Sequence, residues 1–298
     1  MYDFEKGRIK YIKGGKYPQC HTVFIDDEIR VLIDPACDAA KLKALHSDKP
    51  IDIVINSHCH EDHFLNNYLF TEAQLWVPAL EAELFEDINH LIDIWTYMEP
   101  DNREYRESIK KYLLQEAHYQ ERKPDRLLED NEIIELGKTQ MKSLHMPGHS
   151  QGHMCFHFPQ ERVIYTADLD LVKAGPYYGD QGSDVDDMIN SLERLAKIDV
   201  DTYLTAHGKI GIYDGNPDHV IQYLETINQR EERLLEYLSK GPRTLQEITD
   251  QGIIYGKREV TGAWDLTVSE QHMMVKHLKR LERLGKIRSD GDFYIILN

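Results

Sequence analysis

The hydrophobic and polar positions of the first 60 residues follow the pattern of strands separated by tight turns. Apolar runs at 22–25 and 30–33 enclose a short acidic stretch, which predicts a β-hairpin. Asp34-Pro35 should end the second strand, because proline cannot continue a ladder and restricts the residue before it. The pattern then predicts a helix at 39–46 and a short apolar strand at 51–55. Strand, helix and strand in succession indicate an α/β protein.

From about residue 79 to 122 the apolar positions recur at helical spacing, which predicts an insertion of two helices. Its position makes it a candidate lid, and its aromatic residues could equally form a dimer surface. After it, apolar runs predict strands at 132–136, 141–145, 154–158, 163–165 and 202–205, and helical spacing predicts helices at 184–197 and 217–239.

The residues after the predicted helix at 217–239 have a different organisation. Helical patterns at 244–250 and 269–284 precede a small hairpin at 285–297, the order of elements in a winged helix. We therefore expect two domains, a catalytic domain over 1–227 and a winged-helix-like domain over 228–298.

Composition places the chain among ordinary globular proteins. Its 298 residues are 41% hydrophobic and 29% charged, with a formal net charge of −17. No apolar stretch approaches the roughly 18 residues of a membrane span, and the first residues do not resemble a signal peptide, so we expect a cytoplasmic protein without a membrane partner. The four cysteines form no CxxC pair, which argues against a disulfide framework or a four-thiolate zinc site.

Histidines and acids gather directly after the strand at 51–55. In His58-Cys-His60-Glu-Asp62-His63, the alternation of an extended segment places His58 and His60 on one side, where both imidazoles can bind one ion. Asp62 and His63 follow a turn later and suit a second ion. Three histidines and an aspartate within six positions point to metal binding far more than to isolated core or surface residues.

Two coordination shells need further ligands, and three candidates follow other strands. His149 lies in the glycine-flanked loop Pro147-Gly-His-Ser-Gln-Gly-His153. Asp168 follows the strand at 163–165, and His207 follows the strand at 202–205. Open α/β sheets place their sites just beyond strand ends, so these side chains are expected at the same site.

The ordered segments Leu-Ile-Asp34-Pro, HCHEDH, Pro-Gly-His149, Thr-Ala-Asp168 and Ala-His207-Gly resemble those of metallo-β-lactamase-fold hydrolases over residues 20–210. This resemblance implies a four-layer αββα sandwich with a dinuclear metal centre on its edge. It assigns His58, His60 and His149 to one metal and Asp62, His63 and His207 to the other, with Asp168 bridging. It also implies that Asp34 orders the ligand loop without binding metal. His153 is expected to be structural, and Cys59 has no assigned role.

The implied chemistry is metal-assisted hydrolysis. Two divalent cations sharing a water supply hydroxide near neutral pH, which attacks an acyl or phosphoryl centre. The resemblance makes Asp62 the residue that orients this water or receives its proton. Nitrogen and oxygen ligands suit zinc best, with iron or manganese as alternatives.

The resemblance is nearest to glyoxalase-II-like and β-lactamase-like hydrolases, which favours a small-molecule ester, thioester or lactone as substrate. Phe64-Leu-Asn-Asn67 stands where glyoxalase II usually has glycine, and no basic cluster follows Asp168, which disfavours a glutathione thioester. Alternatives are a metal-dependent ribonuclease or phosphodiesterase and a mononuclear-iron persulfide dioxygenase. The segment 175–180 could line the mouth of the site through Tyr177 or Tyr178, or be a packed turn.

Charge distribution bears on the nuclease alternative. Residues 228–298 hold 12 Lys and Arg against 11 Asp and Glu, whereas the rest of the chain holds 23 against 41. A nucleic-acid channel in the acidic part would have to overcome that field, so a nucleic-acid partner is disfavoured. The acidic net charge does not exclude a small anionic substrate, because two bound divalent ions would make the local field positive.

Overall fold

The structure is a computed structural model that describes residues 2–256 and 266–297. The chain divides into two compact units. The first unit comprises Met1–Pro147, Gln151–Asp170 and Ile198–Asn216, and the second comprises Gly148–Ser150, Leu171–Lys197 and Pro217–Asn298. The expected boundary between 227 and 228 stays a prediction, and part of the expected C-terminal domain, 257–265, lies outside the described residues.

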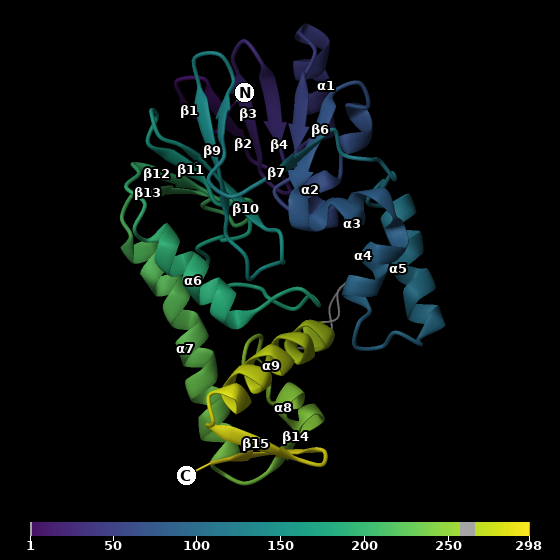
Figure 1. The fold of residues 1–298 in the computed structure, drawn as a ribbon, viewed down its shortest axis with the longest axis vertical. Helices are drawn as coiled ribbons and strands as arrows, with labels where there is room; N and C mark the ends of the chain where they lie inside the picture. Colours follow the sequence, from purple (N-terminus) through teal and green to yellow (C-terminus); the bar gives the residue numbers. More distant parts are fainter. Residues whose placement is uncertain (1, 257–265, 298) are drawn as a thin grey trace. The chain divides into compact units, whose positions relative to one another are not determined.

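The first unit contains two β-sheets (Figure 1). The seven-stranded sheet runs in sequence order: β1 (Phe4–Lys6), β2 (Ile9–Ile12), β3 (Thr22–Asp26), β4 (Arg30–Ile33), β5 (Ile53–Ile55), β6 (Gln74–Pro78) and β7 (Arg126–Leu128). The six-stranded sheet has the order β13 (Ile212–Asp214), β12 (Thr202–Leu204), β11 (Val163–Tyr165), β10 (Met154–Phe158), β9 (Gln140–His145) and β8 (Ile133–Glu135). Neighbours from β4 to β7 are parallel, as are β11 and β12.

Strand alternation explains how the first sheet is buried on both faces. In β3, Val23 and Ile25 join the core shared with Met141 and Phe156 of the second sheet. Phe24, between them, points to the opposite face and joins a second core. Strands buried on both sides read as continuous apolar runs, which is the pattern that predicted them.

Helices cover the outer face of the seven-stranded sheet. These are α1 (Ala39–Asp48), α3 (Ala82–Glu86), α4 (Ile88–Trp95) and α5 (Arg103–Gln115), whose apolar residues belong to that second core. The expected two-helix insertion is wrong in detail, since a 3₁₀ turn (Ala79–Glu81) and α3 precede α4. The reason is local: the backbone is extended at Asp87, whose side chain caps α4 by accepting from Asn89 N–H at 2.8 Å.

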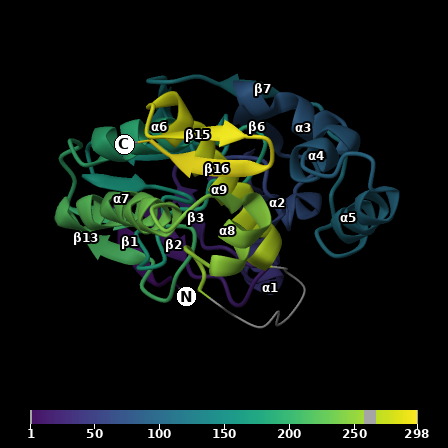
Figure 2. The same cartoon turned by 90° about the horizontal axis from the view of Figure 1, so that it is seen from below.

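The second unit contains α6 (Val185–Leu195), α7 (Asp218–Leu238), α8 (Leu245–Gln251) and α9 (Leu266–Arg283). A three-stranded sheet has the order β14 (Arg243–Thr244), β16 (Phe293–Ile296) and β15 (Ile287–Asp290). Figure 2 shows α8 beside α9 and the β15–β16 hairpin next to them. Leu234, Met274 and Leu278 centre their common core. The succession of two helices, α8 and α9, and then the β15–β16 hairpin matches the predicted order of elements. The winged-helix assignment stays a prediction.

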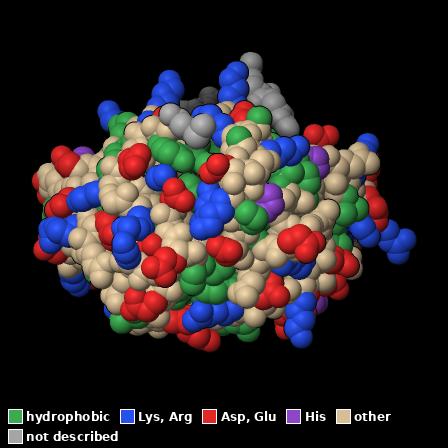
Figure 3. All heavy atoms as spheres, turned by 90° about the horizontal axis from the view of Figure 1, so that it is seen from above, with side chains coloured by type: hydrophobic (Ala, Val, Ile, Leu, Met, Phe, Trp, Pro, Cys, Tyr) green, Lys and Arg blue, Asp and Glu red, His purple; other side chains and the backbone are tan. Residues whose placement is uncertain are grey.

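The surface carries charge of both signs. On the face shown in Figure 3, acidic and basic side chains are interspersed, with apolar side chains between them. No helix among the described residues is long and apolar enough to cross a membrane.

Candidate metal centre

The predicted site residues of the first unit follow four strands. Asp34 follows β4, and His58 and His60 follow β5 after the pair Asn56-Ser57. Asp168 and His207 stand three residues beyond the ends of β11 and β12. Because the strands of each pair are parallel, their carboxyl ends meet at one edge of the sheet, where such sites form.

The structure brings these side chains into two adjoining clusters. The ligand atoms of His58, His60 and Asp168 all lie within 4.8 Å of one another. Those of Asp62, His63 and His207 form a second group within the same limit. A short helix, α2 (Glu61–Phe64), produces this division, because its first turn carries Asp62 and His63 away from the extended backbone at His60.

Asp168 faces both clusters. Its Oδ1 lies 2.8 Å from His63 Nε2 and 3.4 Å from His207 Nε2. His207 Nε2 also lies 3.2 Å from Asp62 Oδ2. Asp168 therefore belongs to the first cluster and also lies close to two imidazoles of the second.

The electrostatics of the second cluster fit a bound cation. Burial alone would lower the pKa of His63, but the Asp168 carboxylate, with Cys20 and Asp34, raises this pKa well above its ordinary value. The pKa of His207 is likewise raised, since Asp168 and Asp170 outweigh its burial. His63 Nε2 is also buried, and its close contact with Asp168 Oδ1 is an ion-pair contact that does not count as a hydrogen bond. These donors therefore attract positive charge, and their nitrogen and oxygen atoms suit a divalent metal.

Asp34 fixes the orientation of His63. Its fully buried carboxylate accepts hydrogen bonds from Ser57 N–H and Ser57 Oγ, both at 2.7 Å, and from Tyr165 Oη at 2.9 Å. His63 Nδ1 lies 2.9 Å from the same carboxylate and donates to it. This bond leaves Nε2 directed at the cluster, so Asp34 has the supporting position that the resemblance implies.

His153 supports Asp168. Its Nε2 accepts the Asp168 backbone N–H at 3.1 Å, and its Nδ1 donates to the Met146 carbonyl at 3.0 Å. Cys59 is buried, with its thiol directed at the Leu84 carbonyl. Neither residue belongs to the two clusters in the first unit, in line with the roles expected for them.

His149 lies in the three-residue segment that belongs to the second unit. Its side chain is buried, and its Nδ1 lies 3.1 Å from the Tyr177 carbonyl oxygen. A carbonyl only accepts, so Nδ1 carries the proton and Nε2 the lone pair. Tyr178 is fully buried against His277 and Arg230, so packing explains this tyrosine.

Glu81 is a residue that sequence reasoning missed. Its carboxylate is almost fully buried and accepts the backbone N–H of Cys59 at 2.6 Å and of Gly152 at 2.8 Å. It thereby joins the loop of His58 and His60 to the loop that precedes β10. A β-carbon at Gly152 would lie 2.7 Å from Glu81 Cγ, so glycine permits this close approach. No sequence motif marks a single glutamate that acts through backbone groups.

A second unpredicted contact joins the helical insertion to the clusters. Tyr17 Oη donates to Glu61, the neighbour of Asp62, and lies 2.8 Å from Tyr112 Oη on α5. The ring of Trp95, at the end of α4, lies 6.3 Å from the ring of His60. Two aromatic residues of the insertion, Trp95 and Tyr112, therefore lie next to the segment 58–63 that carries the ligands.

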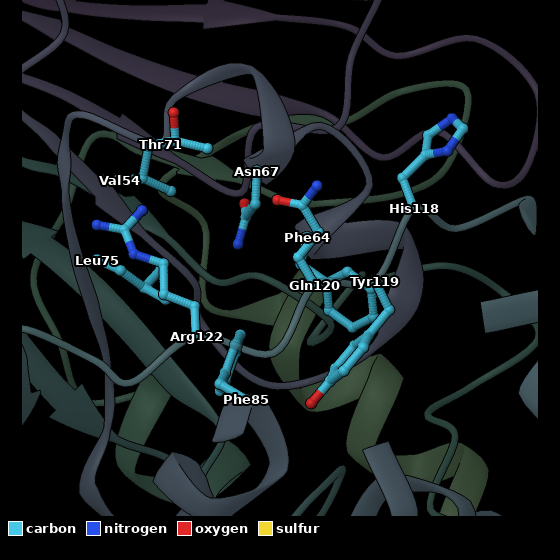
Figure 4. A pocket seen from close by; sticks show the side chains of 10 residues that line it. All are labelled: Val54, Phe64, Asn67, Thr71, Leu75, Phe85, His118, Tyr119, Gln120 and Arg122. Atoms are coloured by element: carbon cyan, nitrogen blue, oxygen red, sulfur yellow. The ribbon is translucent and has the colours of Figure 1, made fainter. Parts of the chain in front are cut away.

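A separate cavity lies under the insertion. It measures about 30 Å³, room for roughly one water molecule, so it is too small for a substrate. Figure 4 shows the side chains around it: Val54, Phe64, Asn67, Thr71, Leu75, Phe85, His118, Tyr119, Gln120 and Arg122.

The two β-sheets and the histidine and carboxylate clusters at their strand ends together define the class of protein. The chain belongs to the metallo-beta-lactamase superfamily, whose family model matches residues 16–207. Two solved structures share the fold over almost the whole chain. A metallo-beta-lactamase family protein from Thermus thermophilus has a TM-score of 0.71 and 19% identity, covering 97% of this chain and 98% of its own. A beta-lactamase domain protein from Burkholderia ambifaria has a TM-score of 0.72 and 16% identity, covering 99% and 93%.

Curated relatives match over shorter stretches. Human acyl-coenzyme A thioesterase MBLAC2 is 25% identical over 154 residues, which are 49% of this chain and 50% of that protein. A hydroxyacylglutathione hydrolase of Francisella tularensis subsp. tularensis is 35% identical over 80 residues, 26% of this chain and 31% of that protein. The chain thus spans half or less of the length of these two relatives.

Proposed function

We propose that this protein hydrolyses acyl thioesters, with esters and lactones as related substrates, at a centre of two divalent metal ions. The observation that carries the proposal is the pair of adjoining clusters that share Asp168. The likeness to an acyl-coenzyme A thioesterase and a hydroxyacylglutathione hydrolase supports a thioester, since both of those proteins act on one.

In this proposal His58, His60 and His149 hold one ion and Asp62, His63 and His207 hold the other, with Asp168 between them. Bound divalent ions would lower the pKa of a water molecule and polarise the carbonyl oxygen of the substrate. Zinc suits these ligands best, with iron or manganese as alternatives.

The residues of the chain have distinct tasks. Asp62, in the second cluster, would orient the attacking water and accept its proton. Asp34 holds His63 in one orientation, and His153 holds the backbone of Asp168. Trp95 offers an apolar surface beside His60, which suits the acyl chain of a thioester.

The alternatives make different demands on the site. A mononuclear-iron enzyme would not need the second cluster of Asp62, His63 and His207. A ribonuclease would need a basic groove to hold the phosphate backbone. A homodimer built on the insertion stays a prediction.

One substrate panel tests the proposal. The metal-loaded protein is assayed against acyl thioesters, lactones, bis(p-nitrophenyl) phosphate and single-stranded RNA, and its metal content is measured. We expect thioester hydrolysis that a chelator removes, and about two metal ions per chain. Cleavage of RNA alone would overturn the proposal.

Two variants test the role of the second cluster. Asp62→Ala or His207→Ala should abolish turnover while leaving the far-ultraviolet circular dichroism unchanged. Asp48→Ala, an exposed position at the end of α1, is the matched control and should retain full activity. Full activity of the Asp62 variant would refute the mechanism.

A further inference from the structure

A pocket of about 360 Å³ opens beside His207, at the second cluster. Two segments of the first unit form it, the β2–β3 loop and the loop after β12. Its lining consists of Lys13, Gly14, Gly15, Tyr17, Gln19, His21, His207, Gly208 and Lys209, and we call it the lysine pocket. Its volume lies within the range of small-molecule sites.

The charge of this pocket contrasts with that of the chain. The protein has a net charge of −17, yet none of the described residues that line the pocket is Asp or Glu. Lys13 and Lys209, both cationic residues, are among its lining residues. Lys13 Nζ donates one hydrogen bond, to the Lys209 carbonyl at 3.1 Å. An ammonium group has three donors, so this bond leaves donors for a ligand.

Hydrogen bonds hold the pocket in shape. His21 Nδ1 accepts the Gly14 N–H at 2.9 Å, so its Nε2 carries the proton and donates to the Gly208 carbonyl at 3.0 Å. The Lys13 N–H donates to Asp3 Oδ2 at 2.8 Å, which fixes the backbone that carries this lysine. A preformed pocket binds a ligand without first paying to order its own loops.

The first cluster has an aromatic neighbour that the lysine pocket does not include. The half-buried ring of Trp95 lies beside His60, in the first cluster, whereas the lysine pocket reaches His207, in the second. A thioester whose carbonyl lies between the clusters would therefore meet the Trp95 ring beside the first cluster and the lysine pocket beside the second.

We propose that the lysine pocket binds a carboxylate or phosphate group on the thiol part of the substrate, while the acyl part lies toward Trp95. This inference rests on the proposed thioesterase function and adds to it the charge and orientation of the substrate. Lys13 and Lys209 are then residues that determine specificity.

The first experiment measures kcat/KM of the metal-loaded enzyme for four thioesters. Butyryl-coenzyme A carries phosphates on the thiol, S-butyrylglutathione carries carboxylates there, and S-butyryl-N-acetylcysteamine is neutral. Succinyl-N-acetylcysteamine carries its charge on the acyl side. We expect the two thiol-charged substrates to be preferred over the neutral one, with less preference at high salt. The stronger of the two identifies the anion as phosphate or carboxylate.

Charge reversal tests the lysines. The double variant Lys13→Glu/Lys209→Glu should lower the ratio of thiol-charged to neutral kcat/KM by about tenfold or more, because two partly exposed charge interactions change sign. Lys43→Glu/Lys49→Glu makes the same change of charge at exposed positions on and just after α1, and should leave the ratio as it is. An unchanged ratio in the pocket variant, or a preference for the succinyl thioester, would overturn the inference.

A binding measurement separates this inference from the proposed function. Isothermal titration of metal-loaded protein with S-methyl-coenzyme A and S-methylglutathione, which cannot be hydrolysed as thioesters, should show binding that weakens in the pocket variant. Hydrolysis of neutral and charged thioesters at equal rates, without such binding, refutes the pocket and keeps the thioesterase. Binding that depends on both lysines, without hydrolysis of any thioester, refutes the thioesterase and keeps the pocket.

Discussion

Glu81 offers a sharp test of how the ligand loops are held. Replacement by Gln keeps the size of the side chain and one acceptor oxygen. The amide NH₂ of Gln would face one of the two backbone N–H groups that now donate to Glu81, and that hydrogen bond would be lost. Hydrogen bonds to a buried charged group contribute about 1.5–3 kcal/mol each, so the loss of one should cost about 2–3 kcal/mol of unfolding free energy.

The same change should loosen the metal centre. Cys59 N–H lies between the two ligands His58 and His60, so a shift of this backbone moves both imidazoles. Supporting groups of this kind typically alter metal affinity by about 10–100-fold. Urea unfolding gives the first quantity, and competition with a chromophoric chelator gives the second.

Two further variants complete the test. Glu83→Gln, exposed on α3, makes the same chemical change two residues away and should alter neither quantity. Gly152→Ala should reproduce the effect from the other loop, because its β-carbon would displace the Glu81 side chain. A Glu81→Gln protein within about 0.5 kcal/mol of the parent stability and with unchanged metal affinity would refute the reasoning.

Three other predictions concern separate features. Asp34→Asn should weaken metal binding about tenfold, because it weakens the bond that orients His63. Asn tolerates the φ of 50° at this position, so the substitution should not strain the backbone. Unchanged metal affinity would count against the orienting role of Asp34. Burial lowers the pKa of Lys276 to about 8, below its ordinary value of 10.5. Between pH 8 and pH 10.5 the Lys276 amine is therefore protonated more in the unfolded state than in the folded state, so the free energy of unfolding rises with pH over this range. The stability gained by Lys276→Met should thus shrink from pH 7 to pH 10, whereas exposed Lys279→Met should show no such trend; parallel pH profiles would refute this. Trp95→Ala should raise KM for long-chain acyl thioesters more than for acetyl thioesters, and equal effects on both would exclude an acyl contact.

The sequence was sufficient to predict the parts of the molecule that depend on local order. The apolar strand at 51–55 and the histidines after it are neighbours in the chain, so their pattern shows both the strand and the ligands. Asp168 and His207 could be added because strand ends of parallel neighbours converge at one edge. Each of these predictions requires only that a strand is recognised and that the residues directly after it are examined.

The remaining features depend on contacts between distant segments. Glu81 acts on backbone N–H groups 22 and 71 residues away, which no residue type at those positions reveals. The same holds for His21, which bonds to a carbonyl 187 residues later. The strand at 74–78 was missed because it directly precedes the helical pattern, and parallel pairing to β5 and β7 rather than its own composition defines it.

The connection between β6 and β7 has a consequence for how substrate range can change. Parallel neighbouring strands cannot be joined by a tight turn, so the chain must leave the sheet after β6 and return to it at β7. We call this connection, residues 79–125, the excursion, and the strands do not determine its length. Here it carries α3, α4 and α5, including Trp95 and Tyr112. This excursion supplies none of the predicted ligands, and Glu81, which supports two of the ligand loops, stands at its start. Grafting the excursion beyond Glu81 from another member of the superfamily should therefore change the proposed acyl preference while every predicted metal ligand stays in place.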